Sequence, residues 1–260
     1  MPFAAASRLK TYVYEEGAGK PSFVLIHGAA YNHRLWIRQW PALSSMGRVV
    51  ALDLPGHGES AKFPAGQAIS IKAYADHTHG VLSTLKCQSN VVIGHSMGGA
   101  VAMRYALDHP RNVRALVLVG TGAKLGVSPT ILEGLSADFE QAVRASIGGW
   151  AFAKTTDERL VEEGIKEMLK CDKSVALADF KACDEFDIRD SVSEIRAPSL
   201  IVVGDEDRLT PVKWSQFLNI NLTGSQMKII KSAGHMVMLE KADQVNDALK
   251  SFVGQLAEYG

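Results

Sequence analysis

The segment that most constrains this chain runs from residue 90 to residue 103 and reads NVVIGHSMGGAVAM. An apolar run typical of a buried strand ends at Gly94, Ser96 follows two residues later, and a helix-like segment begins after Gly99. A serine on such a strand-to-helix turn projects its hydroxyl beyond the sheet, and the glycines let strand and helix approach closely. The free N–H groups of the helix behind it would stabilise a developing negative charge. The segment predicts either a nucleophilic serine or an ordinary turn in which Ser96 caps a helix.

Six short runs, the one that ends at Gly94 included, are mostly apolar throughout rather than alternating, which is typical of strands buried on both faces of a parallel sheet. They cover residues 23–27, 49–53, 90–94, 115–120, 199–204 and 226–230. Helix-like segments fall between or after them, at 71–85, 99–109, 211–222 and 242–256. The alternation predicts an α/β fold, with a mostly parallel sheet and helices on both faces.

One connection between two predicted strands is much longer than the alternation of strands and helices requires. About 78 residues separate Gly120 from Ser199, whereas a connection between a helix and a strand normally takes about 2–6 residues. Apolar residues recur there at spacings of three and four, which predicts helices over 131–147, 157–171 and 174–183. Because ligands bind at the carboxyl ends of the strands in such sheets, we expect residues 123–190 to form a helical cap there. Residues 1–122 and 191–260 would then form the core domain.

Composition excludes several classes of function. The 28 basic and 28 acidic residues balance, so nothing indicates a nucleic-acid partner or an anionic membrane surface. No apolar run reaches the roughly 18 residues of a transmembrane helix, and the first residues lack the pattern of a secretory leader. Cys87, Cys171 and Cys183 lie far apart, without metal-ligand spacing. We therefore expect a cytoplasmic protein with a small-molecule partner and no membrane insertion.

A nucleophilic serine needs a base to accept its proton and an acid to orient that base. Histidine suits the role of base because its ordinary pKa lies near neutral pH. Among the eight histidines, His235 stands out because it lies in a loop between the last apolar run and the last helix. The acid should follow another strand, and Asp205, Glu206 and Asp207 compete for that role after the run at 199–204.

With these residues in place, the chain resembles the α/β-hydrolase superfamily over essentially its whole length, in its serine-nucleophile carboxylesterase form. Members carry nucleophile, acid and histidine in that order along the chain, which Ser96, Asp207 and His235 obey. The family pattern G-x-x-D-x-x-x-P matches the segment 204–211, so the resemblance selects Asp207 among the three carboxylates. It also implies an α/β-hydrolase fold whose helical cap is inserted before the acid-bearing strand.

Two further motifs extend the resemblance. The segment HGAA at 27–30 follows an early strand, where relatives carry an H-G-x-x turn. By analogy, the backbone N–H groups of Ala29 and Met97 would form the oxyanion hole. The segment DLPGHGES at 53–60 matches the family pattern D-x-x-G-x-G-x-S, which we interpret as a structural turn. His27 and His57 lie in these turns, and we expect their side chains to brace loops.

The residues expected to line the substrate pocket are His95, Trp36 and Trp150. For Trp36 and Trp150, a place in the core is the alternative, because buried aromatic side chains more often serve there. His77 and His79 are two apart on a predicted helix and face different directions, so we expect no metal site. The glycines at 120 and 122 lack the spacing of a dinucleotide fingerprint, and no cofactor is expected.

The resemblance implies hydrolysis of a carboxylic ester through an acyl-enzyme intermediate. Hydrolases that cleave carbon–carbon bonds and enol-lactonases share the same layout and cap, and they are the alternative within the superfamily. The alternative from another class is a small-molecule receptor built on the hydrolase fold. The natural substrate depends on cap side chains whose orientation is set by tertiary packing.

Overall fold

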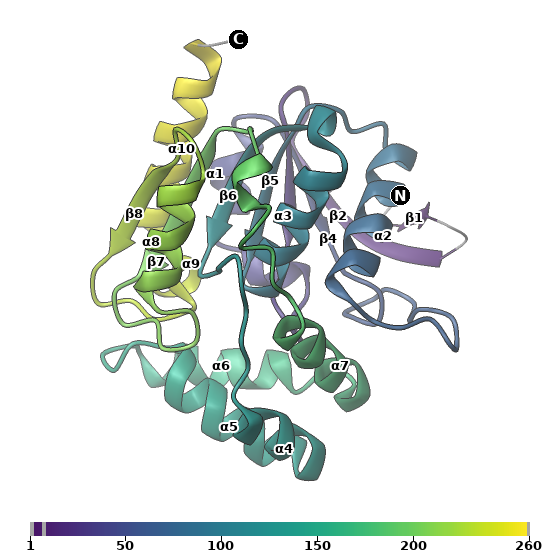
Figure 1. Ribbon diagram of the computed structural model, residues 1–260, viewed down its shortest axis with the longest axis vertical. Helices are drawn as coiled ribbons and strands as arrows, with labels where there is room; N and C mark the ends of the chain where they lie inside the picture. The colour runs from purple at the N-terminus through teal and green to yellow at the C-terminus, as the bar shows by residue number, and fades with distance from the viewer. Residues whose placement is uncertain (1–2, 7–8, 259–260) are drawn as a thin grey trace.

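The fold is an eight-stranded sheet flanked by helices, seen in a computed structural model that describes residues 3–6 and 9–258 (Figure 1). The strand order is β1-β2-β4-β3-β5-β6-β7-β8, in which β2 pairs antiparallel with both β1 and β4 and all later pairs are parallel. The strands are β1 (Phe3–Ala6), β2 (Leu9–Glu16), β3 (Ser22–Ile26), β4 (Arg48–Leu52), β5 (Asn90–His95), β6 (Val113–Val119), β7 (Ser199–Gly204) and β8 (Gln226–Ile230). The six apolar runs correspond to β3 through β8, and the predicted fold class is confirmed.

Successive residues of the central strands enter two different cores. In β3, Val24 and Ile26 pack with the helices α2 and α3, whereas Phe23 and Leu25 pack with α1 and α10. All four side chains are fully buried, which explains why the central strands are apolar at most positions. The helices of this part are α1 (Trp40–Ser44), α2 (Ile71–Thr84), α3 (Met97–Asp108), α8 (Val212–Asn221), α9 (Val237–Glu240) and α10 (Ala242–Glu258).

The long connection between β6 and β7 carries helices that lie together beyond one end of the sheet (Figure 1). They are α4 (Pro129–Ala137), α5 (Phe139–Ser146), the π-helical turn η3 (Ile147–Ala151), α6 (Glu158–Met168) and α7 (Lys173–Asp184). Residues 123–190 are called the cap segment below. The single helix expected over 131–147 is wrong, because Asp138 has extended backbone and its Oδ1 accepts the N–H of Gln141 at 3.0 Å, which begins a new helix.

The sequence analysis does not predict β1 and β2, the two strands at one edge of the sheet. The strand β2 pairs antiparallel with β4, with Val13 opposite Leu52, and it buries only alternate residues.

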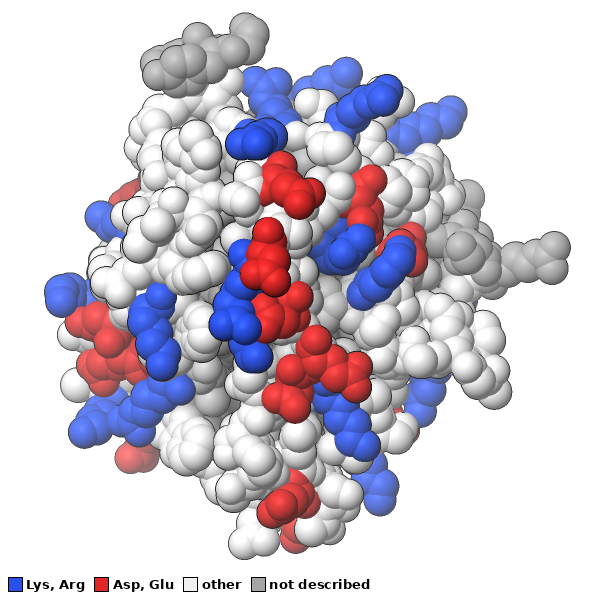
Figure 2. All heavy atoms as spheres, in the orientation of Figure 1, with Lys and Arg blue, Asp and Glu red and all other residues white. Residues whose placement is uncertain are grey.

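Figure 2 shows basic and acidic side chains interspersed on the face of the molecule seen there. Within the described residues, no helix combines the length and the apolar character needed to cross a bilayer.

Candidate functional site

Ser96 occupies the strained corner between β5 and α3. Its backbone angles are φ 53° and ψ −118°, so a side chain stands in the left-handed region, where glycine is usual. Its N–H donates to the carbonyl of Val119 at 3.0 Å, which ties the corner to the neighbouring strand β6. Stored strain of this kind is typical of functional positions, and it orients the serine hydroxyl away from the sheet.

The corner is tight because Gly98 packs directly against the end of β3. A Cβ atom at Gly98 would collide with the backbone carbonyl oxygens of Ile26 and His27. We predict that Gly98→Ala lowers the free energy of unfolding by about 1–3 kcal/mol, as overpacking does. The displaced corner should also lower kcat/KM by about 10²-fold.

Thermal unfolding and ester turnover measured on the same samples test this prediction. Gly254→Ala is the matched control, because a Cβ there meets nothing within 4 Å and Gly254 lies inside α10. It should leave activity unchanged and stabilise the helix by about 0.5–1 kcal/mol. Equal behaviour of the two variants would contradict the close-packed corner.

Its burial and the hydrogen bonds that it accepts distinguish Asp207 from the two competing carboxylates. It is 5% exposed, and its Oδ1 accepts the backbone N–H groups of Leu209 and Thr210 at 2.9 and 2.8 Å. The neighbouring Asp205 instead pairs with Lys231 at 3.3 Å, and Glu206 accepts the N–H of Lys154 at 3.2 Å. Of the three, Asp207 is the one whose carboxylate meets the histidine.

His235 is held by that carboxylate through one ring nitrogen. Its Nδ1 lies 2.9 Å from Asp207 Oδ2, and the Thr210 hydroxyl donates to the same oxygen at 2.8 Å. An ionised carboxylate only accepts hydrogen bonds, so Nδ1 carries the proton and Nε2 is the basic nitrogen. Gly120 leaves room for this pair, since a Cβ there would stand 3.2 Å from His235 Nδ1.

His27 braces the loops around the site, as expected, and His95, which lines the cavity, does so too. His95 Nε2–H donates to the backbone carbonyl of His235 at 3.1 Å. Burial, followed by the nearby His235, holds the pKa of His95 well below its usual range, so His95 stays neutral. His27 donates to Gly28 O at 2.8 Å through Nδ1 and accepts the N–H of Leu54 at 3.0 Å through Nε2. It therefore joins the turn after β3 to the loop after β4.

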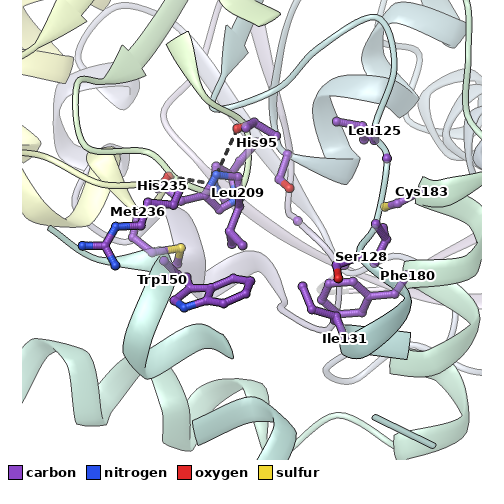
Figure 3. Close-up of a pocket in the computed structure, with 18 of the residues that line it drawn as sticks. His95, Leu125, Ser128, Ile131, Trp150, Phe180, Cys183, Leu209, His235 and Met236 are labelled. Atoms are coloured by element: carbon purple, nitrogen blue, oxygen red, sulfur yellow. Dashed lines mark hydrogen bonds between the residues drawn. The ribbon is translucent and has the colours of Figure 1, made fainter. Parts of the chain in front are cut away.

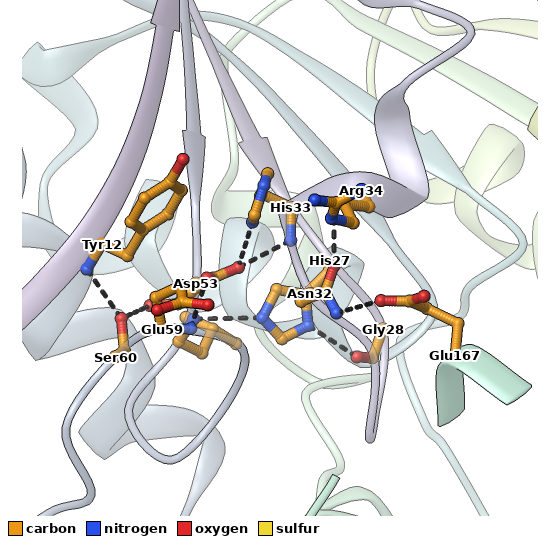
Figure 4. Close-up of polar contacts among 11 residues, drawn as sticks. Tyr12, His27, Gly28, Asn32, His33, Arg34, Asp53, Glu59, Ser60 and Glu167 are labelled. Atoms are coloured by element: carbon orange, nitrogen blue, oxygen red, sulfur yellow. Dashed lines mark hydrogen bonds and ion pairs between the residues drawn. The ribbon is translucent and has the colours of Figure 1, made fainter. Parts of the chain in front are cut away.

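The segment expected to form a structural turn does so around Asp53. This fully buried carboxylate accepts the N–H of His33 at 2.7 Å and the N–H of Glu59 at 3.0 Å (Figure 4). Burial opposes its ionisation, but the contacts with His33 and His27 outweigh burial and lower the pKa of Asp53. Gly58 has φ 49° and lies against this carboxylate, where any Cβ would collide.

The turn after β3 brings Ala29 to the same place. Tyr31 N–H donates to Gly28 O at 3.3 Å, and Ala30 has φ 57°, which fits the third position of a type II turn. A Cβ at Gly28 would stand 3.4 Å from Ser96 Cβ, so the turn packs directly against the serine corner. Ala29 lines the cavity beside Ser96. Met97, the first residue of α3, is fully buried behind Ser96.

A cavity of about 210 Å³ lies between the strand ends and the cap segment (Figure 3). Ser96, His95 and His235 line it from the core, and Trp150 lines it from η3. Figure 3 shows Leu209, Met236 and Trp150 on one side, and Leu125, Ile131, Phe180 and Cys183 on the other. The expectation for Trp36 is wrong, because this side chain, the last of η1 (His33–Trp36), is fully buried in the core and does not line the cavity.

Glu240 is a supporting residue that the sequence analysis missed. Its Oε1 accepts the N–H of Gly234 at 2.9 Å, and its Oε2 accepts the N–H of Ala153 and the hydroxyl of Thr156 at 2.9 and 2.6 Å. It thereby joins the loop that carries His235 to the cap segment. Ala153 lies 87 residues away along the chain, so no local pattern signals this contact. Thr210 was also missed, although a hydroxyl three residues after the acid is a signal within its motif.

Comparisons with known proteins agree with this fold. A family model described as alpha/beta hydrolase fold matches residues 21–242. The pimeloyl-[acyl-carrier protein] methyl ester esterase of Neisseria meningitidis is 27% identical over 242 residues, covering 88% of this chain and 92% of that protein. The 2-hydroxy-6-oxo-2,4-heptadienoate hydrolase of Pseudomonas putida is 30% identical over 257 residues, covering 91% and 90%.

A solved structure has the same architecture. The esterase from Exiguobacterium antarcticum superimposes with a TM-score of 0.90 at 25% identity, covering 97% of this chain and 98% of that chain. The match therefore includes the cap segment as well as the sheet. With the family model spanning most of the sequence, the chain belongs to the alpha/beta hydrolase fold family.

Proposed function

We propose that this protein is a serine hydrolase that cleaves carboxylic esters through an acyl-enzyme intermediate. The observation that carries the proposal is the contact of 2.9 Å between Asp207 Oδ2 and His235 Nδ1, in a cavity that Ser96 also lines. That contact leaves His235 Nε2 as the base for a serine hydroxyl. The esterase activity named for the relative from Neisseria meningitidis supports the same chemistry.

In the proposed mechanism, Ser96 Oγ attacks the ester carbonyl while His235 Nε2 takes its proton. The backbone N–H groups of Ala29 and Met97 stabilise the oxyanion, and each such donor contributes about 3–4 kcal/mol to the transition state. His235 then gives the proton to the leaving alcohol. Water repeats the sequence and releases the acid, while the Asp207 carboxylate stabilises the imidazolium in both steps.

We propose an uncharged, apolar acyl group as the part of the substrate that fills the cavity. Most of the lining is apolar, from Trp150 and Leu209 to Phe180. Of the two cationic side chains in the described lining, Lys124 is paired with Asp187 at 3.3 Å, and Arg208 is exposed and donates to Gly149 O at 3.2 Å. Residues 123–190 would act as a lid domain on the core and exclude bulk water from the acyl-enzyme.

We also propose a cytoplasmic location, which the three free cysteines support. Cys87, Cys171 and Cys183 form no disulfide, as is usual in a reducing compartment.

Cleavage of a carbon–carbon bond is the second candidate, because the relative from Pseudomonas putida is named as a hydrolase of a dienoate. A panel of p-nitrophenyl esters of increasing chain length, assayed beside a vinylogous diketone, separates the two reactions. We expect kcat/KM for the best ester to exceed that for the diketone by at least 100-fold. A diketone cleaved faster than every ester would establish the second candidate. Binding of these compounds without turnover of any of them would indicate a receptor.

A further inference from the structure

Asp179, in the cap helix α7, is a buried carboxylate that the proposed mechanism does not use. Its side chain is fully buried, and its oxygens meet three groups of the core. Oδ2 accepts the backbone N–H of Ala30 at 2.9 Å and lies 2.7 Å from His57 Nε2. Oδ1 accepts the hydroxyl of Tyr74 at 2.6 Å. One carboxylate of the cap segment is therefore held by the 28–31 turn, by the loop after β4 and by α2.

The contact with His57 is a buried ion pair. Burial disfavours the imidazolium, but the Asp179 carboxylate outweighs this effect and raises the pKa of His57 to about 10. His57 also donates to the carbonyl of Pro55 at 3.2 Å through Nδ1, so both ring nitrogens act as donors. The charge of Asp179 is thus compensated within the protein, and its remaining oxygen lone pairs accept N–H and O–H groups.

The contact with Ala30 bears on the proposed oxyanion hole. Ala30 has φ 57°, a conformation that alanine adopts only when its surroundings impose it. The Ala30 N–H belongs to the peptide that links Ala29 to Ala30. Only the Cα and the carbonyl carbon of Ala29 separate it from the Ala29 N–H that is proposed to bind the oxyanion. On the other side, the same turn packs against Ser96 and His95 through Gly28. Asp179 thus fixes the Ala30 peptide of this turn from the cap, while the Tyr31 hydroxyl of the same turn donates to the cap carbonyl of Gly164 at 3.2 Å.

We propose that Asp179 is a positioning residue, which aligns the Ala29 N–H for the oxyanion only while α7 is seated on the core. Seating of the cap and completion of the oxyanion hole then become one event. A cap displaced by an entering substrate would release the 28–31 turn and switch off the chemistry until it returned. This inference rests on the proposed function, because the turn has a catalytic role only if Ser96 is the nucleophile.

The test compares Asp179→Ala with Glu167→Gln. Glu167 is also a cap residue, and its Oε1 accepts Asn32 Nδ2–H at 2.6 Å, so it joins the cap segment to the same loop without touching Ala30 (Figure 4). Asp179→Ala should lower kcat at least tenfold and weaken inhibition by an alkylboronic acid, which mimics the tetrahedral state, by a similar factor. KM should change less than twofold. Glu167→Gln should leave all three quantities within twofold of wild type.

The single variant leaves His57 without its partner and can fail to fold. The double variant Asp179→Leu/His57→Leu removes the buried charges together, which is often neutral for stability. It should melt near the wild-type temperature and show the same loss in kcat and boronate affinity. A folded double variant with wild-type kcat and boronate affinity would overturn the proposal.

Hydrogen exchange keeps this test separate from the proposed function. In the Asp179 variants, the amides of residues 28–31 should exchange at least tenfold faster than in Glu167→Gln, whether or not the protein cleaves esters. Fast exchange in a protein without esterase activity would refute the proposed function and leave the structural role of Asp179 standing. Unchanged exchange would refute the positioning role itself.

Discussion

Replacing Ser96 with alanine is expected to lower kcat for ester hydrolysis by about 10⁴–10⁶-fold, close to what binding and oxyanion contacts alone provide. The effect should appear almost entirely in kcat, because the cavity that binds the acyl group is unchanged. Alanine occupies the left-handed backbone at this corner no worse than serine does, so the melting temperature should stay within a few degrees. Steady-state kinetics and thermal unfolding of the same preparation measure both quantities.

The control for this substitution is Ser83→Ala, an exposed serine near the end of α2. It should retain full activity. Wild-type activity in Ser96→Ala would refute the nucleophile, and a large drop in melting temperature would indicate that Ser96 serves the fold instead.

Asp207→Asn is expected to lower kcat by about 10⁴-fold at neutral pH. The reason lies in the donors around this carboxylate. Its Oδ1 accepts two backbone N–H groups, so the oxygen of an asparagine would stay on that side. The amide NH₂ would then face His235 Nδ1, which would have to accept, and the ring proton would move to Nε2. A histidine in that tautomer cannot take the serine proton.

Asp205→Asn is the matched control for the acid. Asp205 comes from the same strand end and pairs with Lys231 at 3.3 Å on the partly exposed side of the loop. Its replacement should change kcat less than threefold. If Asp205→Asn were the more damaging variant, the assignment of the acid would be wrong.

Much of the fold can be predicted from local patterns in the sequence. Strands buried on both faces, such as β3 and β4, are mostly apolar, so runs of apolar residues predict them. The run that became β8 was expected to be buried in the same way, but β8 lies at the edge of the sheet and exposes Gln226, Lys228 and Ile229. The strand β2, second from the other edge of the sheet, buries alternate residues and carries charged ones, so it gives no such run. The break at Asp138 also escapes a search for periodicity, because the apolar spacing continues across it.

The same distinction applies to the residues of the site: local turn sequence predicts some of them, and tertiary packing determines the others. Turn chemistry marks Ser96, because only a strand–glycine–serine–glycine–helix arrangement exposes a hydroxyl at that corner. The direction of a side chain is a tertiary property, which is why Trp36 was assigned to the pocket and lies in the core. Asp179 meets Tyr74, His57 and Ala30 across 105, 122 and 149 residues, and nothing in the adjacent sequence indicates those contacts.

The most direct test of the nucleophile is covalent labelling with a fluorophosphonate, followed by mapping of the adduct in a tryptic digest. The peptide that spans residues 87–104 contains Ser89 and Ser96, and its fragment ions distinguish them. We predict one adduct per chain, on Ser96, formed much more slowly in Asp207→Asn and absent in Ser96→Ala. An adduct on another residue, or an active wild-type protein that takes up no label, would contradict the assignment of Ser96 as the nucleophile.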